Sequence, residues 1–284
     1  MFDRPPCYNK PMKEIKMAFV QAEVEKLIHK CLTCADESVT RALENIDTNF
    51  ATERTAAALI AENNRIAQKN DMYCCQDTGQ ALFFVKLGED VHCKGLNGAL
   101  SSAVKNAYST ARKSVADPFT GLNTGDNLPA IIETELVPGD NLEITFLAKG
   151  AGSENMSRLY MLTPASGIEG VIDSVVDAVR LGGRNACPPL VVGVGVGGVT
   201  ETACRLSKKA LLRPIGEHNA RTDIAEIEKE ILLRVNALGI GVAALGGALT
   251  ALAVNIEEAP THIGMLPVAV NLGCHSLRHG TVIF

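Results

Sequence analysis

Three cysteines in glycine- or proline-flanked segments have the residue type and setting of a metal site. Cys75 opens the run CQDTG, Cys187 stands in NACPP, and Cys274 stands in NLGCH. Thiolates bind zinc and iron–sulfur clusters, but spacings of 112 and 87 residues match no zinc finger or ferredoxin pattern. The residues alone therefore leave metal ligation and a structural role both open. A cluster held by only three cysteines would keep one iron free for a substrate.

Polar side chains near these cysteines could supply acid–base chemistry or bind a substrate. Gln76 and Asp77 directly follow Cys75 and would lie beside a metal, where a carboxyl group can exchange a proton. His262 falls in a turn after a predicted strand, and Arg112 on a predicted helix could bind a carboxylate through two hydrogen bonds. Each also has a structural interpretation, as a turn residue, a surface loop histidine or a solvated helix arginine.

A glycine-rich run, VVGVGVGGVT, offers a different chemistry. Gly193, Gly195 and Gly198 satisfy G-x-G-x-x-G between a predicted strand and a predicted helix, as in dinucleotide-binding sites. Such a site also needs an acidic residue at the end of a strand about twenty positions later, but residues 213–218 have a loop-like sequence. Three interpretations stay open: an NAD site, close backbone packing, and a helix N-terminus that faces another anion.

Cysteine content and charge limit the cellular setting and the partners. The nine cysteines are odd in number, and a chain of 284 residues needs no disulfides, which favours a reducing, cytoplasmic location. Cys31 and Cys34 form a single C-x-x-C in a helical pattern, which indicates structural thiols. The 27 basic and 32 acidic residues give a net charge of −5 without a basic run, so we expect no nucleic-acid partner. No long apolar window occurs, and Met1–Pro6 lacks a signal-peptide pattern, so we expect no membrane association.

The elements that must position these residues follow from hydrophobic spacing. Residues 13–70 carry apolar residues at helical spacing, which predicts a helical lead-in. The next predicted elements are a strand at 81–87, a helix at 95–115, a loop at 117–129, and an antiparallel hairpin of 130–137 with 142–148.

The second half alternates between the two element types. Predicted helices cover 168–181, 200–212 and 223–238, and predicted strands cover 189–194, 249–256 and 265–271. No linker or internal repeat divides the sequence. The predicted fold class is mixed α/β (α+β), with a helical N-terminal region followed by β-strands and helices packed in one domain, residues 1–284.

Five motifs together resemble one family, the class I (iron–sulfur) fumarases and L-tartrate dehydratases. They are CQDTG at 75–79, NTGDNLP at 123–129, KGAGSEN at 149–155, NACPP at 185–189 and the tail from His262 to Cys274. The resemblance extends from about Lys13 to the C-terminus. It implies a 4Fe-4S cluster held by Cys75, Cys187 and Cys274, with Cys75 preferred over Cys74 because the family ligand directly precedes QDTG.

The resemblance also implies roles for other residues. Gln76, Asp77, Arg112, Gly152 and His262 match positions that contact a small dicarboxylate substrate in the family. Asp77 is expected to handle a proton, while His262 orients the substrate's hydroxyl or carboxylate.

The resemblance further implies which subunit this chain is and which reaction it takes part in. The family's second catalytic domain, fused or a separate β subunit, lies outside this chain, so we expect an α subunit of a hetero-oligomer. Residues 152–157 are closer to the fumarase branch, which favours reversible hydration of fumarate to malate, with L-tartrate dehydratase as the alternative. More distant alternatives are an NAD-dependent oxidoreductase that uses Gly193–Gly198 and a non-catalytic cluster or redox-sensing protein.

Overall fold

The computed structural model describes residues 12–284, and these residues form two compact units. Unit 1 contains the described residues up to Cys31, then Gln80–Ala148 and His279–Phe284, while unit 2 contains Leu32–Gly79 and Lys149–Arg278. Helices and mixed sheets occur in both, which confirms the mixed α/β class. Each unit takes segments from distant parts of the sequence, so no linker in the sequence could mark a boundary between the two units. The single domain expected for residues 1–284 stays a prediction. Met1–Pro6, from which the lack of a signal peptide was inferred, lies outside the described residues.

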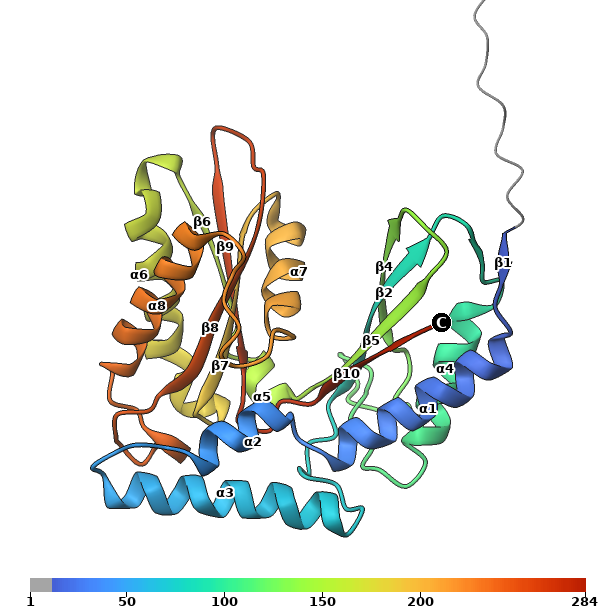
Figure 1. The fold of residues 1–284 in the computed structure, drawn as a ribbon, viewed down its shortest axis with the longest axis horizontal. Helices are drawn as coiled ribbons and strands as arrows, with labels where there is room; N and C mark the ends of the chain where they lie inside the picture. Colours follow the sequence, from blue (N-terminus) through green and yellow to red (C-terminus); the bar gives the residue numbers. More distant parts are fainter. Residues whose placement is uncertain (1–11) are drawn as a thin grey trace, which may run out of the picture. The chain divides into compact units, whose positions relative to one another are not determined.

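Unit 1 is built on a four-stranded sheet in the order β10-β5-β2-β4 (Figure 1). Its elements are β1 (Lys13–Glu14), α1 (Met17–Thr33), β2 (Gln80–Gly88), β3 (Val91–His92), α4 (Leu96–Ala107), β4 (Ile131–Val137), β5 (Leu142–Lys149) and β10 (His279–Ile283). β1 and β3 form a separate two-stranded parallel pair.

The predicted hairpin of β4 and β5 is wrong, because β2 lies between them and pairs in parallel with β4. The turn after β4 folds over the end of β2, where the N–H of Gly88 donates to the Asn141 carbonyl at 2.9 Å. A Cβ on Gly88 would lie 2.4 Å from the Gly139 oxygen. The sequence identified the turn residues correctly. The turn, however, connects β4 to β5 past β2 instead of joining two neighbouring strands.

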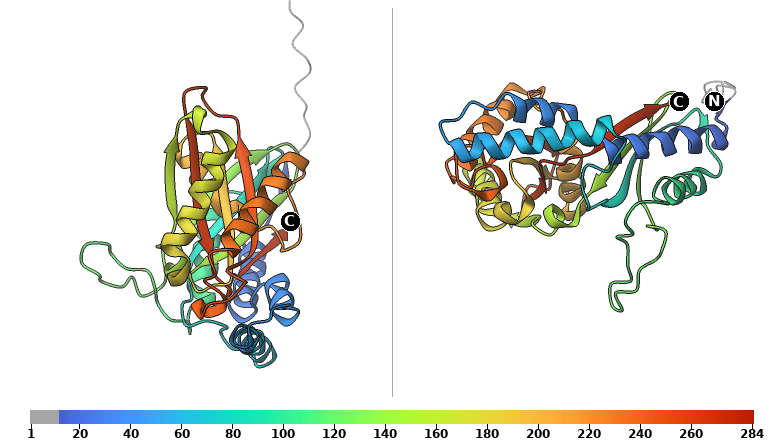
Figure 2. Two further views of the ribbon diagram at one scale, coloured as in Figure 1. Left: turned by 90° about the vertical axis from the view of Figure 1, so that its left-hand side faces the viewer. Right: turned by 90° about the horizontal axis from the view of Figure 1, so that it is seen from below.

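The helix predicted for residues 95–115 ends at Ala107. A long loop follows and extends away from the rest of unit 1 (Figure 2). Buried Asn127 fixes this loop, because its Oδ1 accepts the Ser114 N–H at 2.6 Å and its Nδ2 donates to the Arg112 carbonyl at 3.2 Å. Arg112 therefore lies in a loop and not on a helix.

The predicted helical N-terminal region is confirmed, but it consists of three separate helices and not of continuous helical spans. α1 is followed by α2 (Glu37–Glu44) and α3 (Ala51–Lys69). The break before α2 has a simple cause, since the Asp36 carboxylate accepts the N–H groups of Ser38 and Val39 at 2.8 and 3.3 Å and caps the new helix.

Unit 2 has a sheet in the order β6-β9-β7-β8, with α7 on one face and α6 and α8 on the other (Figure 1). Its further elements are α5 (Ala151–Glu154), β6 (Arg158–Leu162), α6 (Gly167–Gly182), β7 (Leu190–Gly197), α7 (Thr200–Ala210), α8 (Thr222–Asn236), β8 (Ala251–Ala259) and β9 (Leu266–Gly273). β7 runs parallel to β8 and antiparallel to β9, which is also antiparallel to β6. Valine, isoleucine and leucine side chains of the sheet, α6 and α8 form the core.

The glycines of the G-x-G-x-x-G pattern bring α7 close to β7. A Cβ on Gly193 would lie 2.1 Å from the Ser207 carbonyl oxygen, and one on Gly195 would lie 2.0 Å from that of Ala203. Only glycine permits so close an approach of helix backbone to strand backbone. Helix packing therefore explains these two glycines without a nucleotide.

Gly195→Ala is expected to lower the free energy of unfolding by about 1–3 kcal/mol, because the new methyl group would overlap helix backbone. Urea denaturation of the apo-protein measures the change. Gly98→Ala in α4 is the control, since a Cβ there meets no atom within 4 Å and alanine favours a helix. A Gly195 variant as stable as the wild type would contradict the packing argument.

Candidate functional site

Cys187 and Cys274 lie at the same end of the unit 2 sheet. Cys187 precedes β7 and Cys274 directly follows β9, and in this antiparallel pair Val191 lies opposite Gly273. The N–H of His275 donates to the Cys187 carbonyl at 3.2 Å, which joins the two segments. Strand register therefore brings together two cysteines that are 87 residues apart.

Cys75 reaches the same place from the segment after α3. Its neighbour Cys74 is buried, with its Sγ 3.8 Å from the Ser276 Oγ and 3.4 Å from the Leu32 carbonyl oxygen. Burial raises the pKa of both Cys187 and Cys274, and negative charge on Cys75 raises both pKa values further. The three predicted ligands thus interact electrostatically within unit 2.

The described residues do not form a preassembled site for a single metal ion. Among residues 12–284, no three His, Cys, Asp or Glu side chains lie close enough to hold one metal ion. The three cysteines are close enough for negative charge on Cys75 to raise the pKa of Cys187 and of Cys274, which is compatible with ligands to one shared group.

Arg278 is one of two buried cations at this site, and sequence reasoning missed it. It is 1% exposed, its Nε donates to the Ser276 carbonyl at 3.1 Å, and its Nη2 donates to the Asp77 carbonyl at 2.7 Å. Its charge opposes the effect of burial on the pKa of Cys274. Its Nη1 is buried without a hydrogen-bond partner, as is Nδ1 of His275 beside Cys274. An unsatisfied buried guanidinium N–H beside thiols fits an anionic group at this position.

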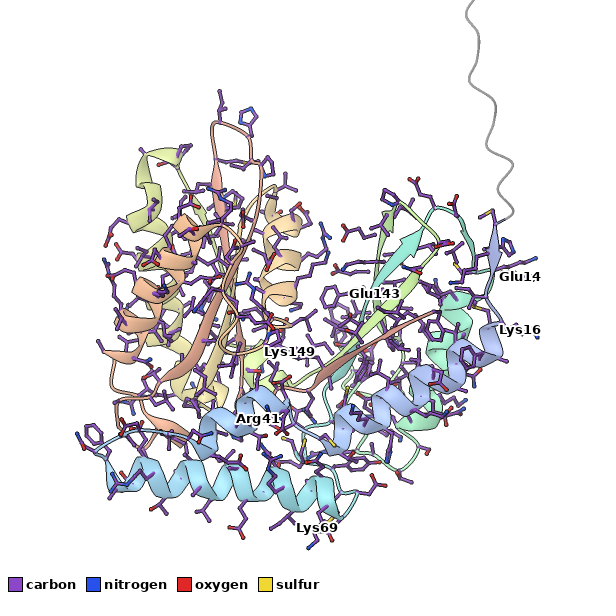
Figure 3. All side chains as sticks on the ribbon, in the orientation of Figure 1. Glu14, Lys16, Arg41, Lys69, Glu143 and Lys149 are labelled. Carbon is purple, nitrogen blue, oxygen red and sulfur yellow. The ribbon has the colours of Figure 1, made fainter. Side chains whose placement is uncertain are left out.

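Lys149 adds a second buried cation (Figure 3). Its side chain donates to the Ser153 Oγ at 2.8 Å and pairs with Glu154 at 3.2 Å. Burial lowers the pKa of Lys149, and its charge also acts on Cys274. The KGAGSEN motif contained both charged residues, but only the structure shows that they pair.

Glu154 stays ionised because two lysines surround it. Burial alone would raise its pKa, but Lys149 and Lys208 outweigh burial and lower the pKa to about 2. Its Oε2 also accepts from Asn271 at 3.0 Å. Because the folded pKa lies below the ordinary glutamate pKa of 4.5, Glu154 stabilises the fold above that pH and loses this contribution as pH falls toward 2.

Glu154→Gln is therefore expected to reduce the pH dependence of stability. Between pH 5 and about pH 2, the wild-type apo-protein should lose more of its free energy of unfolding than the variant does. Urea midpoints across this range measure the difference. Exposed Glu62→Gln on α3 is the control and should leave the slope unchanged, and equal slopes for wild type and Glu154→Gln would contradict the assignment.

Asp77 is held by two backbone donors. Its Oδ1 accepts the Gly79 N–H at 2.9 Å and its Oδ2 accepts the Ala151 N–H at 2.8 Å. A Cβ on Gly150 would lie 3.1 Å from Oδ2, so glycine lets the start of α5 approach the carboxylate. Asp77 therefore has a fixed orientation beside Cys75.

Gly152 and Gln76 lie in the same region. Gly152 belongs to α5, and a Cβ there would lie 3.8 Å from the carbonyl oxygen of Asn185, two residues before Cys187. Gln76 is an exposed residue between Cys75 and Asp77. The structure thus gathers six predicted site residues at one end of the sheet: Cys75, Gln76, Asp77, Gly152, Cys187 and Cys274.

The remaining predicted residues are His262, in unit 2, and Arg112, in unit 1. His262 occupies the exposed loop between β8 and β9, where its Nδ1 accepts the Gly264 N–H at 3.0 Å. The eight residues of β9 separate this loop from Cys274, so His262 is at the opposite end of the sheet. Arg112 belongs to unit 1. Within unit 2 the structure does not bring His262 to the cysteines.

No helix among the described residues has both the length and the apolarity to cross a membrane.

Comparison with known proteins identifies the family. Residues 21–283 match the family model described as fumarate hydratase (fumerase). "Putative L(+)-tartrate dehydratase subunit alpha" of Methanocaldococcus jannaschii is 39% identical over 268 residues, which cover 90% of this chain and 94% of that protein. L(+)-tartrate dehydratase subunit alpha of Escherichia coli O157:H7 is 38% identical over 216 residues, 74% of this chain and 71% of that protein. The five motifs predicted this result, and the chain belongs to the fumarate hydratase (fumerase) family of hydro-lyases.

Proposed function

We propose that this chain is the α subunit of a hydro-lyase that depends on a 4Fe-4S cluster and reversibly hydrates fumarate to malate. The convergence of Cys75, Cys187 and Cys274 at one end of the unit 2 sheet carries the proposal. Family membership supports the hydro-lyase class. The nearby cations Lys149 and Arg278 support binding of an anionic cluster and an anionic substrate.

The bound cluster would supply a Lewis-acidic iron with an open coordination position. Asp77 is the group on this chain that would hold or move a proton, and its two backbone hydrogen bonds fix it for that task. Gln76 and the backbone at Gly152 would bind the dicarboxylate. Arg112 is proposed to contact the same substrate. His262 is expected from the family resemblance to orient the substrate's hydroxyl or carboxylate, but within this chain it lies at the opposite end of the unit 2 sheet, so the geometry of unit 2 does not support that role.

L-tartrate dehydratase is the second candidate, because both relatives described above carry that name. The sequence of residues 152–157 favours fumarate. Parallel assays of fumarate hydration and L-tartrate dehydration separate the two, and the substrate with the larger kcat/KM identifies the activity.

A β subunit is the proposed partner, in a hetero-oligomer. The word alpha in the names of the relatives supports this assignment. The eight cysteines among the described residues are all free thiols, which supports a cytoplasmic location. Packing of α7 on Gly193 and Gly195 weakens the NAD-dependent alternative.

Anaerobic purification, with iron and sulfide analysis and a visible spectrum, tests the proposal. We expect about four irons and four sulfides per chain for a 4Fe-4S cluster, and hydration activity when the chain is combined with its β subunit. A protein that stays iron-free after anaerobic reconstitution would overturn the cluster. Ordinary turnover by the reconstituted chain alone would overturn the need for a partner.

A further inference from the structure

Glu53 on α3 is a fully buried carboxylate in unit 2. It accepts hydrogen bonds from the Thr48 hydroxyl at 2.6 Å, the Leu249 N–H at 2.8 Å, the Ala248 N–H at 3.0 Å and the Val242 N–H at 3.4 Å. Burial alone would raise the pKa of Glu53, but these donors outweigh it and lower the pKa. One ionised side chain therefore organises backbone from residues 242 to 249.

The segment 241–249, here named the anchor loop, is shaped around this carboxylate. A Cβ on Gly247 would lie 2.3 Å from the Glu53 Oε1, so only glycine fits there. Ala243 and Ala244 adopt left-handed conformations with φ of 53° and 59°. Non-glycine residues keep such conformations only where their surroundings hold them. Here Glu53 accepts backbone hydrogen bonds from residues on both sides of the two alanines.

The anchor loop in turn holds the segment that carries Cys187. The Ala243 N–H donates to the Pro188 carbonyl at 2.8 Å, and just past the loop the Thr250 carbonyl accepts the Leu190 N–H at 2.9 Å. Cys187 itself is left-handed, with φ of 54°, so its conformation also depends on its neighbours. We propose that Glu53 is a positioning residue for Cys187, acting through the anchor loop.

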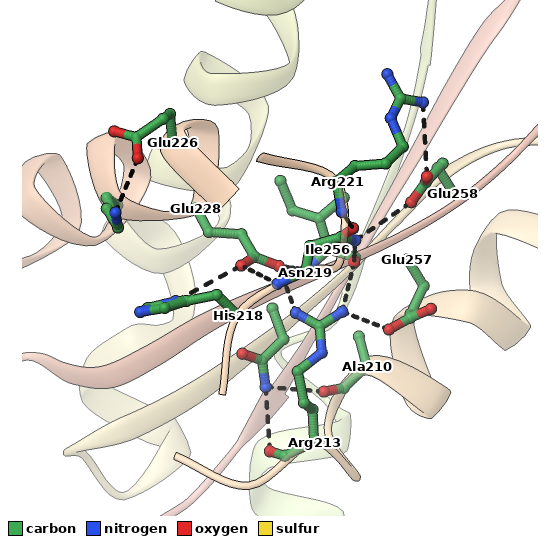
Figure 4. A network of polar contacts seen from close by, with 12 residues as sticks. Ala210, Arg213, His218, Asn219, Arg221, Glu226, Glu228, Ile256, Glu257 and Glu258 are labelled. Atoms are coloured by element: carbon green, nitrogen blue, oxygen red, sulfur yellow. Dashed lines mark hydrogen bonds and ion pairs between the residues drawn. The ribbon is translucent and has the colours of Figure 1, made fainter. Parts of the chain in front are cut away.

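A matched control exists in the same unit. Glu228 is 2% exposed, and its carboxylate accepts the Ile256 N–H at 2.7 Å and the Asn219 N–H at 3.1 Å and pairs with Arg213 (Figure 4). Like Glu53, it is a buried carboxylate that binds backbone N–H groups. Its hydrogen bonds go to segments without a predicted ligand, so Glu228→Gln is expected to destabilise the fold without releasing Cys187.

The inference rests on the proposed cluster, so the first measurement needs no iron. Amide hydrogen exchange in the apo-protein compares Glu53→Gln and Glu228→Gln with the wild type. Glu53→Gln is expected to speed exchange by at least about tenfold at Ala243 and at His275, whose N–H donates to the Cys187 carbonyl. Glu228→Gln is expected to speed exchange at Ile256 and leave Ala243 and His275 unchanged. Equal effects of both variants at Ala243 and His275 would overturn the proposal.

The second measurement follows the cluster spectroscopically. After anaerobic reconstitution, loss of cluster absorbance to a chelator is timed below the unfolding temperature of every variant. Glu53→Gln is expected to lose iron about 10- to 100-fold faster, as is common when residues that orient a ligand are changed, and Glu228→Gln at the wild-type rate. Equal rates for the two variants would overturn the proposal. A wild type that binds no iron would refute the cluster, while exchange in the apo-protein would still decide the role of Glu53.

If Glu53→Gln does not fold, a less disruptive variant tests the same proposal. Thr48→Val removes one of the four donors to Glu53 and is expected to speed exchange at Ala243 and His275 by about three- to tenfold. Unchanged exchange at both amides would overturn the proposal.

Discussion

Serine in place of Cys75, Cys187 or Cys274 should each abolish stable binding of the 4Fe-4S cluster. The three thiols come from the segment after α3, the start of β7 and the end of β9, so none can take the place of another. A cysteine thiol can lose its proton and become a soft anionic ligand near neutral pH, whereas a serine hydroxyl cannot. We therefore expect about four irons in the wild type and almost none in each variant.

Two control cysteines make this experiment specific. Cys204→Ser changes an exposed thiol on α7 and should retain all iron. Cys74→Ser tests the neighbour of Cys75, whose Sγ already contacts Ser276 and the Leu32 carbonyl, and it should also retain the cluster. Circular dichroism would confirm that each variant is folded. Full iron content in any of the three ligand variants would remove that residue from the site.

The sequence predicted most elements of unit 2 because its helices end at clear signals. Gly182 ends α6, while α8 and β7 fall close to their expected ranges. Local patterns failed where strand pairing was decided by distant segments. The turn after β4 matched a hairpin in type, yet β2 occupies the place beside β4, and nothing within residues 130–148 could indicate that.

The site could be predicted where one short motif carried several residues. Cys75, Gln76 and Asp77 are adjacent, so they lie together in any fold. Arg278 escaped sequence reasoning because its role depends on burial beside the Asp77 carbonyl, 201 residues away in sequence. His262 belonged to the family motif, but the length of β9 separates it from Cys274 within unit 2.

The glycine pattern shows why a motif needs its structural context. Gly193 and Gly195 meet the spacing of a dinucleotide site, but each faces backbone of α7 at a distance that any side chain would block. In a dinucleotide site, glycine lets a phosphate approach the backbone closely, whereas here it lets a helix approach the strand closely. The neighbouring element decides between them.

Asp77→Asn should reduce kcat by about a hundredfold or more in the complex with the β subunit, if Asp77 transfers a proton. Asparagine has nearly the same shape but cannot take up a proton at neutral pH. One of its two side-chain atoms would be an NH₂ group facing the N–H of Gly79 or Ala151, so some displacement is expected as well. The experiment must therefore separate loss of proton transfer from loss of position.

Three readouts achieve this separation. Iron content and the visible spectrum of Asp77→Asn should equal those of the wild type, because Asp77 is not a predicted ligand. KM should change far less than kcat if substrate binding is kept and chemistry is lost. Asp223→Asn, which removes an exposed carboxylate on α8, should leave all values unchanged. Unchanged turnover in Asp77→Asn would refute its role in proton transfer, and a loss of iron together with activity would show that it supports the cluster instead.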